Sequence, residues 1–406
     1  MLFWTREEYQ TFRVDIDVLF GRELLGRGHA IDFVMQAGST SVPPGPHPWC
    51  GRIVHVGPTG GHGLAGRIAK HLRGAYHDLR ALRLARRSDY DAIQVRDKFF
   101  IAAVALAVAR RRGLKFFFWL SFPYPEDDSL RAQMPSTRFR RLVALRGKVS
   151  AWLLYRWILP RADHTFVQSE RMRQDIAVHG VPVAKMTPVP MGIDLADVPE
   201  ELRTAPLPRD GEVILGYLGT LSADRHIETL VDMLAELRRT LVRVRLLLIG
   251  DAHQRADREA IVQRAHALGV SQWLEITGYL PRLEALRRMR DTHIALSPYF
   301  PAPLLMSTSP TKLVEYLALG LPVVASDHPE QRAILRESGA GVCAPWGARH
   351  FARSVRWLMR LPPQKLAAMG ERGRPWVQEH RTYSHIADNL EKVYLRQLDL
   401  DEACVH

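Results

Sequence analysis

The chain has 406 residues, enough for two domains of ordinary size, each with its own core. With 47% hydrophobic and 24% charged residues, its composition is typical of a soluble globular protein. Its three cysteines show no metal-ligand spacing and favour a reducing cytoplasm over a disulfide framework. We expect no signal peptide, and the longest apolar run, residues 99–109, is too short to span a bilayer.

The formal net charge of +13 is unevenly distributed. Residues 1–195 carry 29 Lys/Arg and 17 Asp/Glu, a balance of +12, whereas residues 196–406 carry 27 and 26, a balance of +1. The first half is therefore expected to meet something acidic, such as membrane phospholipid, a lipid diphosphate or nucleic acid. Zinc-finger, RNA-binding aromatic and zipped basic motifs are missing from the sequence, so we expect no nucleic-acid partner.

Apolar segments in the first half alternate between strand and helix patterns, which favours a parallel sheet covered by helices. The expected strands are residues 2–4, 31–35, 52–56, 90–97, 115–121 and 164–169, and the expected helices are 18–28, 64–87, 99–112 and 170–179. Residues 39–48 and 122–128 are predicted to be loops because they are rich in proline and polar residues. We assign residues 1–195 to the first domain.

Two short motifs in this half suggest ligands. Asp15 and Asp17 have a spacing that can hold a metal, but they precede a helix, where capping or dipole pairing explains them. Residues 57–63 form a glycine loop that could approach a phosphate, although its spacing matches neither nucleotide fingerprint, and a mobile connection is favoured. We expect no metal and no bound cofactor.

Residues 137–159 form a basic helical segment with six Lys/Arg, no acidic residue, and aromatic Trp152, Tyr155 and Trp157. Such a helix can lie at the headgroup boundary of an anionic membrane. Leu and Trp at helical spacing are also typical of a buried core. Both interpretations remain open.

The second half repeats the alternation. Strands are expected at residues 213–219, 244–250, 273–278 and 294–298, and helices at 227–240 and 283–290. We predict a second doubly wound domain over residues 209–380, joined by a proline-spaced hinge over 190–208. A helix over residues 386–397 is expected to end the domain, and the segment 381–406 is expected to pack back on the first domain.

The most informative stretch is Ser309–Ser326. Ser309 is a possible helix cap and Pro310 suits the first helical position, while Gly320 offers a left-handed stop. Leu313 and Leu317 mark the inward face. Residues 323–325 then look like a buried parallel strand.

The start of this helix predicts an anion site. Free N–H groups of Thr311, Lys312 and Leu313 point out of the first turn, where the helix dipole and the lysine both favour negative charge. Glu315 follows on the same side, and its carboxylate could accept two hydrogen bonds from a ribose diol. The alternative is that Lys312 and Glu315 merely form an exposed pair.

Residues 309–327, with the run Gly320-Leu-Pro-Val-Val-Ala-Ser-Asp327, resemble the nucleotide-sugar motif of family 4-type retaining glycosyltransferases (glycosyl transferases group 1). Residues 188–194 resemble the turn that ends the first domain in that family. The resemblance implies an α/β GT-B fold, in which two Rossmann-like doubly wound domains face a cleft. It also implies that Glu315 binds ribose and that the helix start binds the diphosphate of the donor.

The resemblance implies a wider donor site. Arg225 is the nearest equivalent of a basic residue that the family uses, with His226 as the fallback. The implied donor-binding residues are Gly219, Thr220, Arg225, Gly278, Tyr279, Leu280, Ser307, Ser309, Thr311, Lys312, Leu313 and Glu315. Ser307 departs from the family pattern, because a glutamate that contacts the donor sugar often stands there.

Lys312 and Arg225 are the candidate catalytic groups, and Glu126 is a further candidate in the first domain. The family often places a histidine near residues 121–128, where this chain has only Ser121, Tyr124, Glu126 and Asp127 as nearby polar groups.

The implied activity is metal-independent retaining transfer, of hexosyltransferase type, from a nucleotide-diphosphate sugar to a glycan or lipid-linked acceptor. Bacterial surface polysaccharide synthesis, in the cytoplasm or at the inner face of the plasma membrane, is the expected setting. One alternative is a nucleotide-sugar 2-epimerase of the same fold. Another is a non-catalytic scaffold of a polysaccharide complex.

Overall fold

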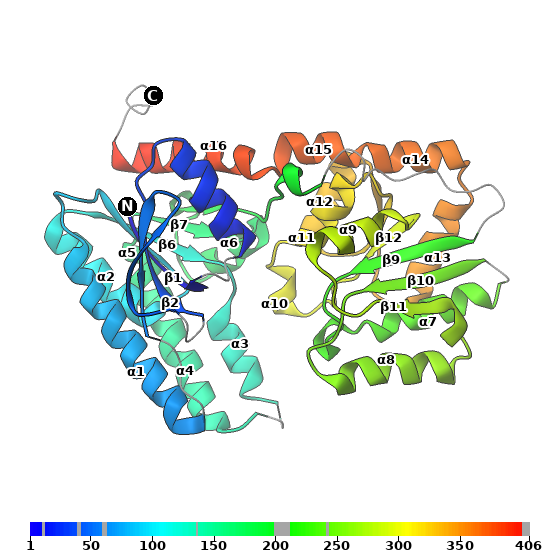
Figure 1. Cartoon of the computed structure of the whole chain (residues 1–406), viewed down its shortest axis with the longest axis horizontal. Helices are drawn as coiled ribbons and strands as arrows, with labels where there is room; N and C mark the ends of the chain where they lie inside the picture. The colour runs from blue at the N-terminus through cyan, green and yellow to red at the C-terminus, as the bar shows by residue number, and fades with distance from the viewer. Residues whose placement is uncertain are drawn as a thin grey trace. The chain divides into compact units, whose positions relative to one another are not determined.

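The computed structural model describes residues 1–9, 13–38, 42–58, 63–134, 137–198, 212–240 and 243–399. The chain divides into two compact units (Figure 1). Unit 1 comprises residues 1–191 and 383–406, and unit 2 comprises residues 192–382.

Unit 1 contains an eight-stranded sheet in the order β3-β4-β2-β1-β5-β6-β7-β8. Neighbouring strands are parallel except β3 and β4, which are antiparallel. The strands are β1 (Leu2–Tyr9), β2 (Asp32–Ala37), β3 (Gly45–Trp49), β4 (Arg52–Val56), β5 (Ala92–Arg96), β6 (Lys115–Leu120), β7 (His164–Val167) and β8 (Met186–Pro188).

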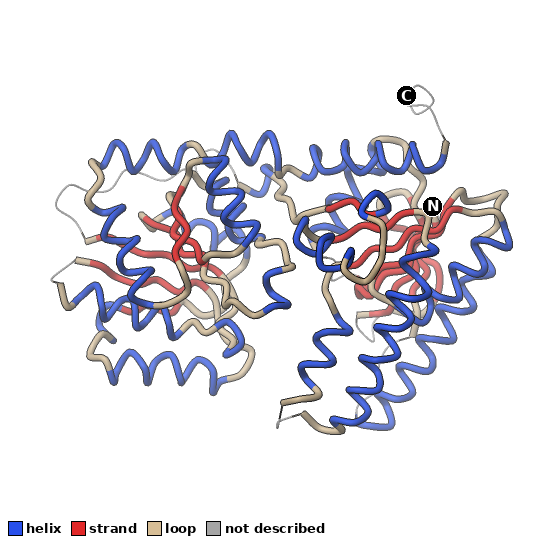
Figure 2. Tube along the Cα trace, turned by 180° about the vertical axis from the view of Figure 1, so that it is seen from behind, coloured by secondary structure: helices blue, strands red, loops and turns tan. Residues whose placement is uncertain are grey.

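Helices cover both faces of this sheet (Figure 2). Because successive side chains of a strand point to opposite faces, Trp4 packs in one core beside α2 residues, and Phe3 packs in the other beside η1 and α16 residues. The helical segments are η1 (Asp15–Leu24), α1 (Gly63–Ala81), η2 (Leu82–Leu84), α2 (Phe99–Arg112), α3 (Tyr124–Arg131), α4 (Arg140–Trp152), η3 (Leu153–Ile158), α5 (Leu159–Arg161), α6 (Glu170–Ala177), η4 (Val183–Lys185) and α16 (Tyr383–Leu398).

The last helix, α16, belongs to the core of unit 1. Tyr394 is buried, and its hydroxyl donates a 2.6 Å hydrogen bond to Oε1 of Gln94 in β5. Leu390 and Ile386 pack in the same cluster. Helix α16 therefore covers one face of a sheet whose strand β5 lies 300 residues earlier in the sequence.

Unit 2 contains a six-stranded, all-parallel sheet in the order β11-β10-β9-β12-β13-β14. Its strands are β9 (Val213–Leu218), β10 (Val244–Ile249), β11 (Leu274–Ile276), β12 (Ile294–Ser297), β13 (Val323–Ser326) and β14 (Gly341–Ala344). Its helices are η5 (Leu195–Asp197), η7 (Ala223–Arg225), α7 (Glu228–Arg238), α8 (Arg255–Ala267), η8 (Ser271–Trp273), α9 (Arg282–Arg290), α10 (Pro303–Met306), α11 (Thr311–Ala318), α12 (Pro329–Ser338), α13 (Ala348–Met359), α14 (Pro363–Glu371) and α15 (Gly373–His380). The crossover between parallel strands at β9, where the order reverses, is the usual place for a nucleotide.

The predicted alternation of strands and helices is confirmed, but two predicted loops are wrong. Residues 45–49 form the edge strand β3, because Pro46 and Pro48 are tolerated on an edge where alternate N–H groups need no partner. Residues 124–131 form α3, because Pro125 stands in its first turn, where a helix accepts proline.

Several predicted boundaries also shift. The first strand extends to Tyr9 rather than ending before residue 5, and α1 ends at Ala81 rather than near residue 87. Residues 59–62 of the glycine loop and 199–208 of the predicted hinge lie outside the described residues.

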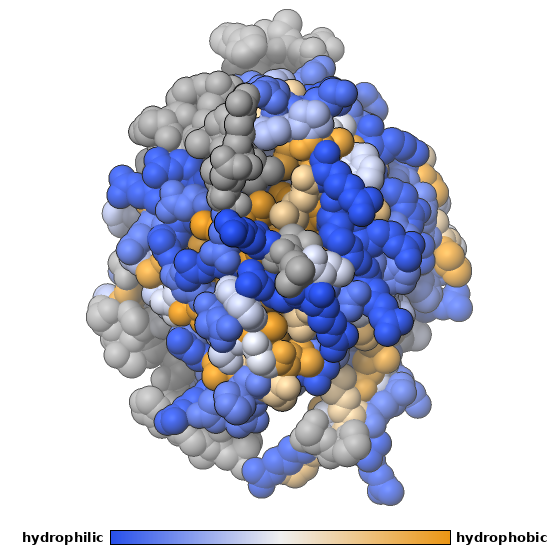
Figure 3. All heavy atoms as spheres, turned by 90° about the vertical axis from the view of Figure 1, so that its right-hand side faces the viewer, coloured by the Kyte–Doolittle hydropathy of each residue, from blue (hydrophilic) through white to orange (hydrophobic). Residues whose placement is uncertain are grey.

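The surface seen in Figure 3 is mostly hydrophilic, with groups of hydrophobic side chains among the hydrophilic ones. Within the described ranges, no helix has both the length and the apolar character that a membrane crossing needs.

Candidate functional site

The centre of the candidate site is α11, which follows a short connection from α10. The helix begins at Thr311, with Pro310 at the cap position and no side-chain cap. The prediction that Ser309 caps it is therefore wrong. The Ser309 hydroxyl instead donates a 2.8 Å hydrogen bond to Glu330 Oε1, which leaves the first-turn N–H groups of α11 without that partner.

The body of α11 is fixed by packing. Leu313, Val314 and Leu317 are buried as predicted, and Gly320 has the left-handed φ of +74° that ends the helix. Arg374 Nη1 donates to the carbonyl of Ala318 at 3.1 Å and so satisfies an end of the helix. The first turn is thus the free end of a rigid element.

Lys312 lies in the first turn against β9 and its loop. Its ammonium stands 5.8 Å from the ring centroid of Tyr217. Burial, and then the nearby charge of Arg225, lower the pKa of Lys312 to about 8, although Glu315 acts in the opposite direction. An anion bound beside Lys312 would favour the charged form of its ammonium group.

Gly219, at the end of β9, makes room for this lysine. A Cβ atom there would lie 2.1 Å from Lys312 Cε, and its φ of +151° suits glycine. The end of the neighbouring strand β10 lies equally close to this turn. A Cβ atom on Gly250 would lie 2.2 Å from the carbonyl oxygen of Gly219. Gly250 in turn bridges to Gly278, which has a φ of +77°. Three successive strand ends thus approach each other through glycine.

Glu315 is buried, with 7% of its surface exposed, which rules out the interpretation of an exposed Lys312–Glu315 pair. Its Oε1 accepts a 2.8 Å hydrogen bond from Arg282 Nη1, and Arg282 Nε lies 3.5 Å from Asp197 Oδ2. The carboxylate is therefore held in one position by α9.

Arg225 ends the short segment η7 and faces the same region. It forms a hydrogen bond with Tyr299, whose pKa is raised to about 12 by burial, while the charge of Arg225 opposes that rise. Arg225 Nε is buried without a hydrogen-bond partner among the described residues. The fallback residue, His226, instead packs on Phe300 at a centroid distance of 4.1 Å.

The remaining predicted donor residues surround this centre less closely. Thr220 presents its carbonyl to the Tyr217 hydroxyl at 3.2 Å, and Tyr279 is 89% exposed. Leu280 packs at the margin of the core, and Ser307 is buried at the end of α10. The structure thus brings Lys312, Arg225, Glu315 and the glycine turns together, with the other predicted residues at the periphery.

Glu126, the candidate in unit 1, lies in the first turn of α3. Its Oε1 accepts a 2.6 Å hydrogen bond from the Tyr155 hydroxyl, and Oε2 is buried without a hydrogen-bond partner among the described residues. Asp127 is nearby, and burial raises its pKa. Ser121 is instead engaged with Asp97: its N–H donates to Asp97 Oδ1 at 2.9 Å and its hydroxyl to Oδ2 at 2.5 Å.

This Asp97 belongs to a buried charged cluster that sequence reasoning missed. Arg96 is 1% exposed and lies 2.8 Å from Asp15 Oδ2 and 3.6 Å from Asp97 Oδ2. Burial favours the neutral form of Asp15, but the charges of Arg96 and Arg13 outweigh it and lower the pKa of Asp15. Asp15 therefore pairs with buried Arg96, and the cap on η1 that the sequence suggested is not formed.

Asp97 has two further signs of a functional position. Its φ of +56° is unusual for a residue other than glycine, and such strain gathers at active sites. Burial raises its pKa, while Arg96 and Ser121 oppose the rise. Tyr124, whose ring stacks under Arg6 at 4.4 Å, faces the same cluster. An aspartate between a strand and a helix was the only sequence signal for this position.

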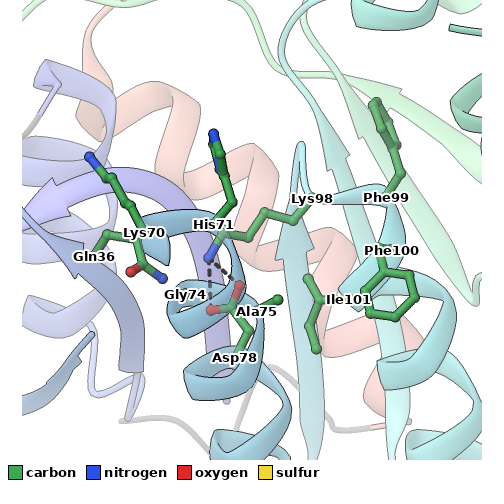
Figure 4. A pocket seen from close by; sticks show the side chains of 10 residues that line it. All are labelled: Gln36, Lys70, His71, Gly74, Ala75, Asp78, Lys98, Phe99, Phe100 and Ile101. Carbon is green, nitrogen blue, oxygen red and sulfur yellow. Dashed lines mark hydrogen bonds and ion pairs between the residues drawn. The ribbon is translucent and has the colours of Figure 1, made fainter. Parts of the chain in front are cut away.

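A cavity of about 280 Å³ opens beside this edge of the unit 1 sheet, between α1 and α2 (Figure 4). Lys98 Nζ contacts both carboxylate oxygens of Asp78, at 2.8 and 2.9 Å, and Gln36 lies at the end of β2. Gln36 Oε1 is buried without a hydrogen-bond partner among the described residues. The cavity combines an apolar wall at Phe100 with polar groups on α1.

For the part of the chain that the structure describes, no group of three His, Cys, Asp or Glu side chains is arranged to hold a metal ion. Asp17, the second member of the Asp-x-Asp pair, lies 3.7 Å from Arg22 on the surface of η1.

Comparison with known families gives two matches that together span most of the chain. Residues 199–376 match the family described as "Glycosyl transferases group 1", and residues 18–197 match "Glycosyltransferase Family 4". The chain belongs to the family 4-type glycosyltransferases. The resemblance seen in the sequence is thereby confirmed.

The curated relatives that match the chain are distant in sequence. A GDP-mannose-dependent alpha-mannosyltransferase of Mycobacterium tuberculosis is 24% identical over 66% of the chain and 64% of its own length. The matched stretches span 40–64% of the length of these curated relatives.

Solved structures show the fold. Sucrose-phosphate synthase from Thermosynechococcus elongatus has a TM-score of 0.72 at 18% identity, over 98% of both chains. Anabaena HepE, in complex with UDP-glucose, has a TM-score of 0.67 at 14% identity, over 97% of this chain and 99% of its own. The predicted GT-B fold is thus confirmed.

Proposed function

We propose that this glycosyltransferase moves a sugar from a nucleotide-diphosphate sugar to a glycan or lipid-linked acceptor, with retention of the anomeric configuration. The setting we propose is bacterial surface polysaccharide synthesis on the cytoplasmic side of the membrane. The observation that carries the proposal is the meeting of Lys312, Arg225 and Glu315 at the free end of α11.

The donor site follows from charge and position. The diphosphate binds to the first-turn N–H groups of Thr311, Lys312 and Leu313, where the helix dipole and two cations neutralise it. Departure of the nucleoside diphosphate concentrates negative charge there, so preorganised Lys312 and Arg225 favour the transition state over the ground state. Protein groups thus supply the positive charge in the metal-independent reaction that we propose.

Glu315 binds the ribose diol. Its Oε1 is fixed by Arg282, and a carboxylate has several lone pairs, so it can accept diol hydrogen bonds while keeping that partner. Gly278, Tyr279 and Leu280 face the base through main-chain groups. Ser307 and Ser309 flank the sugar.

In unit 1, the acceptor meets the carboxyl edge of the sheet. Asp97, oriented by Ser121, is suited to hold an acceptor hydroxyl, because its pKa is raised and it is strained into place. The cavity beside Phe100 and Lys98 offers an apolar wall and polar groups, which suits a sugar ring.

Glu126 remains a candidate for proton transfer, because its Oε2 has no hydrogen-bond partner among the described residues.

The first experiment is a thermal-shift screen across nucleotide sugars. It includes UDP-glucose, which is bound in the HepE structure, and GDP-mannose, which appears in the name of the Mycobacterium tuberculosis relative. A donor that binds the native state raises the melting temperature as its concentration grows. If every nucleotide sugar leaves the melting temperature unchanged, the proposal fails and the non-catalytic scaffold is favoured.

The second experiment identifies the reaction with the donor found. Incubation with a panel of glycan and lipid-linked acceptors, followed by NMR of the product, should give a glycoside with the donor's anomeric configuration. Conversion of donor alone into its 2-epimer would instead favour the epimerase, and an inverted product would contradict retention.

A further inference from the structure

Helix α4 follows α3 in unit 1 (Figure 1). It carries a stripe of exposed hydrophobic side chains. Leu142, Leu145, Val149 and Trp152 are 49–64% exposed, and their spacing of three and four residues places them on one side of the helix. Large apolar side chains gathered in this way mark an interaction surface, whereas single exposed ones do not.

The opposite side of α4 is packed against α3. Gly147 is buried there, and a Cβ atom on it would lie 3.1 Å from Asp128 Cβ and 3.2 Å from the Pro125 carbonyl oxygen. Arg146 anchors the same side through an ion pair with Asp128. Since residues two positions apart are about 200° apart around a helix, Leu145 and Val149 face directly away from this contact. The stripe is therefore the outer surface of the α3–α4 pair and not part of its core.

Positive charge accompanies the stripe. Arg138, Arg141, Lys148 and Arg156 are exposed along the same segment. No carboxylate forms an ion pair with any of these four in the described part of the chain, and residues 137–159 include no Asp or Glu. Four unpaired cations beside an apolar stripe are complementary to a surface that is both apolar and anionic.

Further apolar side chains lie where α3 ends and α4 begins. Leu130, Met134 and Phe139 are 40–57% exposed, so apolar side chains are also exposed where α3 ends and where α4 begins. A protein partner would need to match this whole basic surface, whereas a bilayer with anionic headgroups matches it without a specific shape.

We propose that the outer face of α4 docks on the surface of an anionic phospholipid bilayer. Leu142, Leu145, Val149 and Trp152 enter the boundary between headgroups and acyl chains, where Trp is especially favourable. Arg138, Arg141, Lys148 and Arg156 stay among the phosphates. This surface is independent of the donor site, and docking requires neither nucleotide sugar nor acceptor.

The test is flotation of the full chain with vesicles of phosphatidylcholine alone or mixed with phosphatidylglycerol. We expect binding only to the mixed vesicles, weakened when salt rises from about 0.1 M to about 0.5 M. The double variant Leu142→Glu/Leu145→Glu should lower partitioning about tenfold or more. Arg138→Ser/Arg141→Ser should lower it about fivefold for each cation removed.

Two matched controls keep the test specific. Val178→Glu changes an 85% exposed apolar residue at the end of α6, and Arg349→Ser/Arg353→Ser removes two exposed arginines from α13. Both should float as the native chain does. Quenching by brominated lipid should be clear for the native chain and much reduced for Trp152→Phe, a variant that keeps an aromatic ring in place.

The proposal is overturned if the native chain does not float with mixed vesicles, or if the α4 glutamate variants float as well as the controls. It is also overturned if sedimentation shows that the same variants abolish a dimer while vesicle binding is unaffected, since the stripe would then join two copies. Nucleotide-sugar binding by each variant is measured separately, so loss of docking is distinguished from failure of the donor site.

Discussion

Lys312 carries its charge in surroundings that disfavour it. With a pKa of about 8, it is mostly protonated at pH 7 and mostly neutral at pH 9.5. We therefore expect a nucleoside diphosphate such as UDP to bind up to about thirtyfold more weakly at pH 9.5 than at pH 7, measured by calorimetry.

The Lys312→Met variant keeps the length of the side chain and removes its charge, so its affinity should be low and nearly independent of pH. The stability of the native chain should instead increase with pH. Between pH 8 and its usual pKa of 10.5, this lysine holds a proton in the unfolded chain but has largely lost it in the native chain. The free energy of unfolding therefore rises as pH increases through that window. Equal affinity at both pH values would exclude Lys312 from the diphosphate site.

Glu315 combines a structural and a proposed binding role, and two substitutions separate them. Glu315→Gln keeps a hydrogen-bond acceptor for Arg282 but loses charge, so we expect the donor KM to rise about tenfold or more with a small loss of stability. Arg282→Ala removes the partner alone and should affect the donor less.

Glu284→Gln, on the exposed side of α9, is the matched control and should leave the kinetics unchanged. The measurement is initial rate against donor concentration for the three variants. If Glu315→Gln behaves like Glu284→Gln, Glu315 does not bind ribose.

At the scale of the element, the turn after β9 leaves room for the Lys312 side chain because it contains Gly219. In Gly219→Ala the new Cβ atom would collide with Lys312 Cε, the movable end of a side chain, so we expect Lys312 to be displaced while the fold survives. The free energy of unfolding should fall by about 1–3 kcal/mol from backbone strain, and nucleotide affinity should fall about tenfold or more.

Gly269→Ala is the comparison, because Gly269 has a φ of +67° but no atom within 4 Å of its added Cβ. It carries the backbone strain without the collision. Calorimetry and urea unfolding on both variants should show similar losses of stability but weak nucleotide binding only in Gly219→Ala. Equal nucleotide affinity in the two variants would contradict this role of the turn.

These elements also show what the sequence could reveal. Helix α2 has the predicted bounds because its apolar run is followed by three arginines and then by Gly113, which has a left-handed φ of +69°. Strand β3 and helix α3 were missed because Pro46 and Pro125 look like breakers, and only their places on a sheet edge and in a first turn make them acceptable. An element such as α2, whose start and end are marked by neighbouring residues, was predictable. Elements such as β3 and α3, which tolerate proline only because of their place in the fold, were not.

The residues of the candidate site likewise fall into those that the sequence could predict and those that it could not. Lys312 and Glu315 lie close in sequence, so their shared helix face was evident. Arg282 lies 33 residues from Glu315, and their ion pair forms only when α9 packs beside α11. The charges of Arg96 and Asp97 resemble ordinary surface charges until the sheet buries them. Pairing across the fold has no local signature.

At the scale of the whole molecule, each unit has its own core, and the last helix belongs to the first of them. Tyr394→Ala removes a buried ring and leaves Gln94 without its 2.6 Å hydrogen bond, so it should destabilise unit 1 by about 3–5 kcal/mol. Leu234→Ala, in the core of unit 2, should destabilise that unit by about 2–5 kcal/mol. Because the altered residues share no core, we expect each variant to shift a different transition in urea unfolding. One transition that both variants shift equally would show that the two cores unfold together and that α16 stabilises the entire chain.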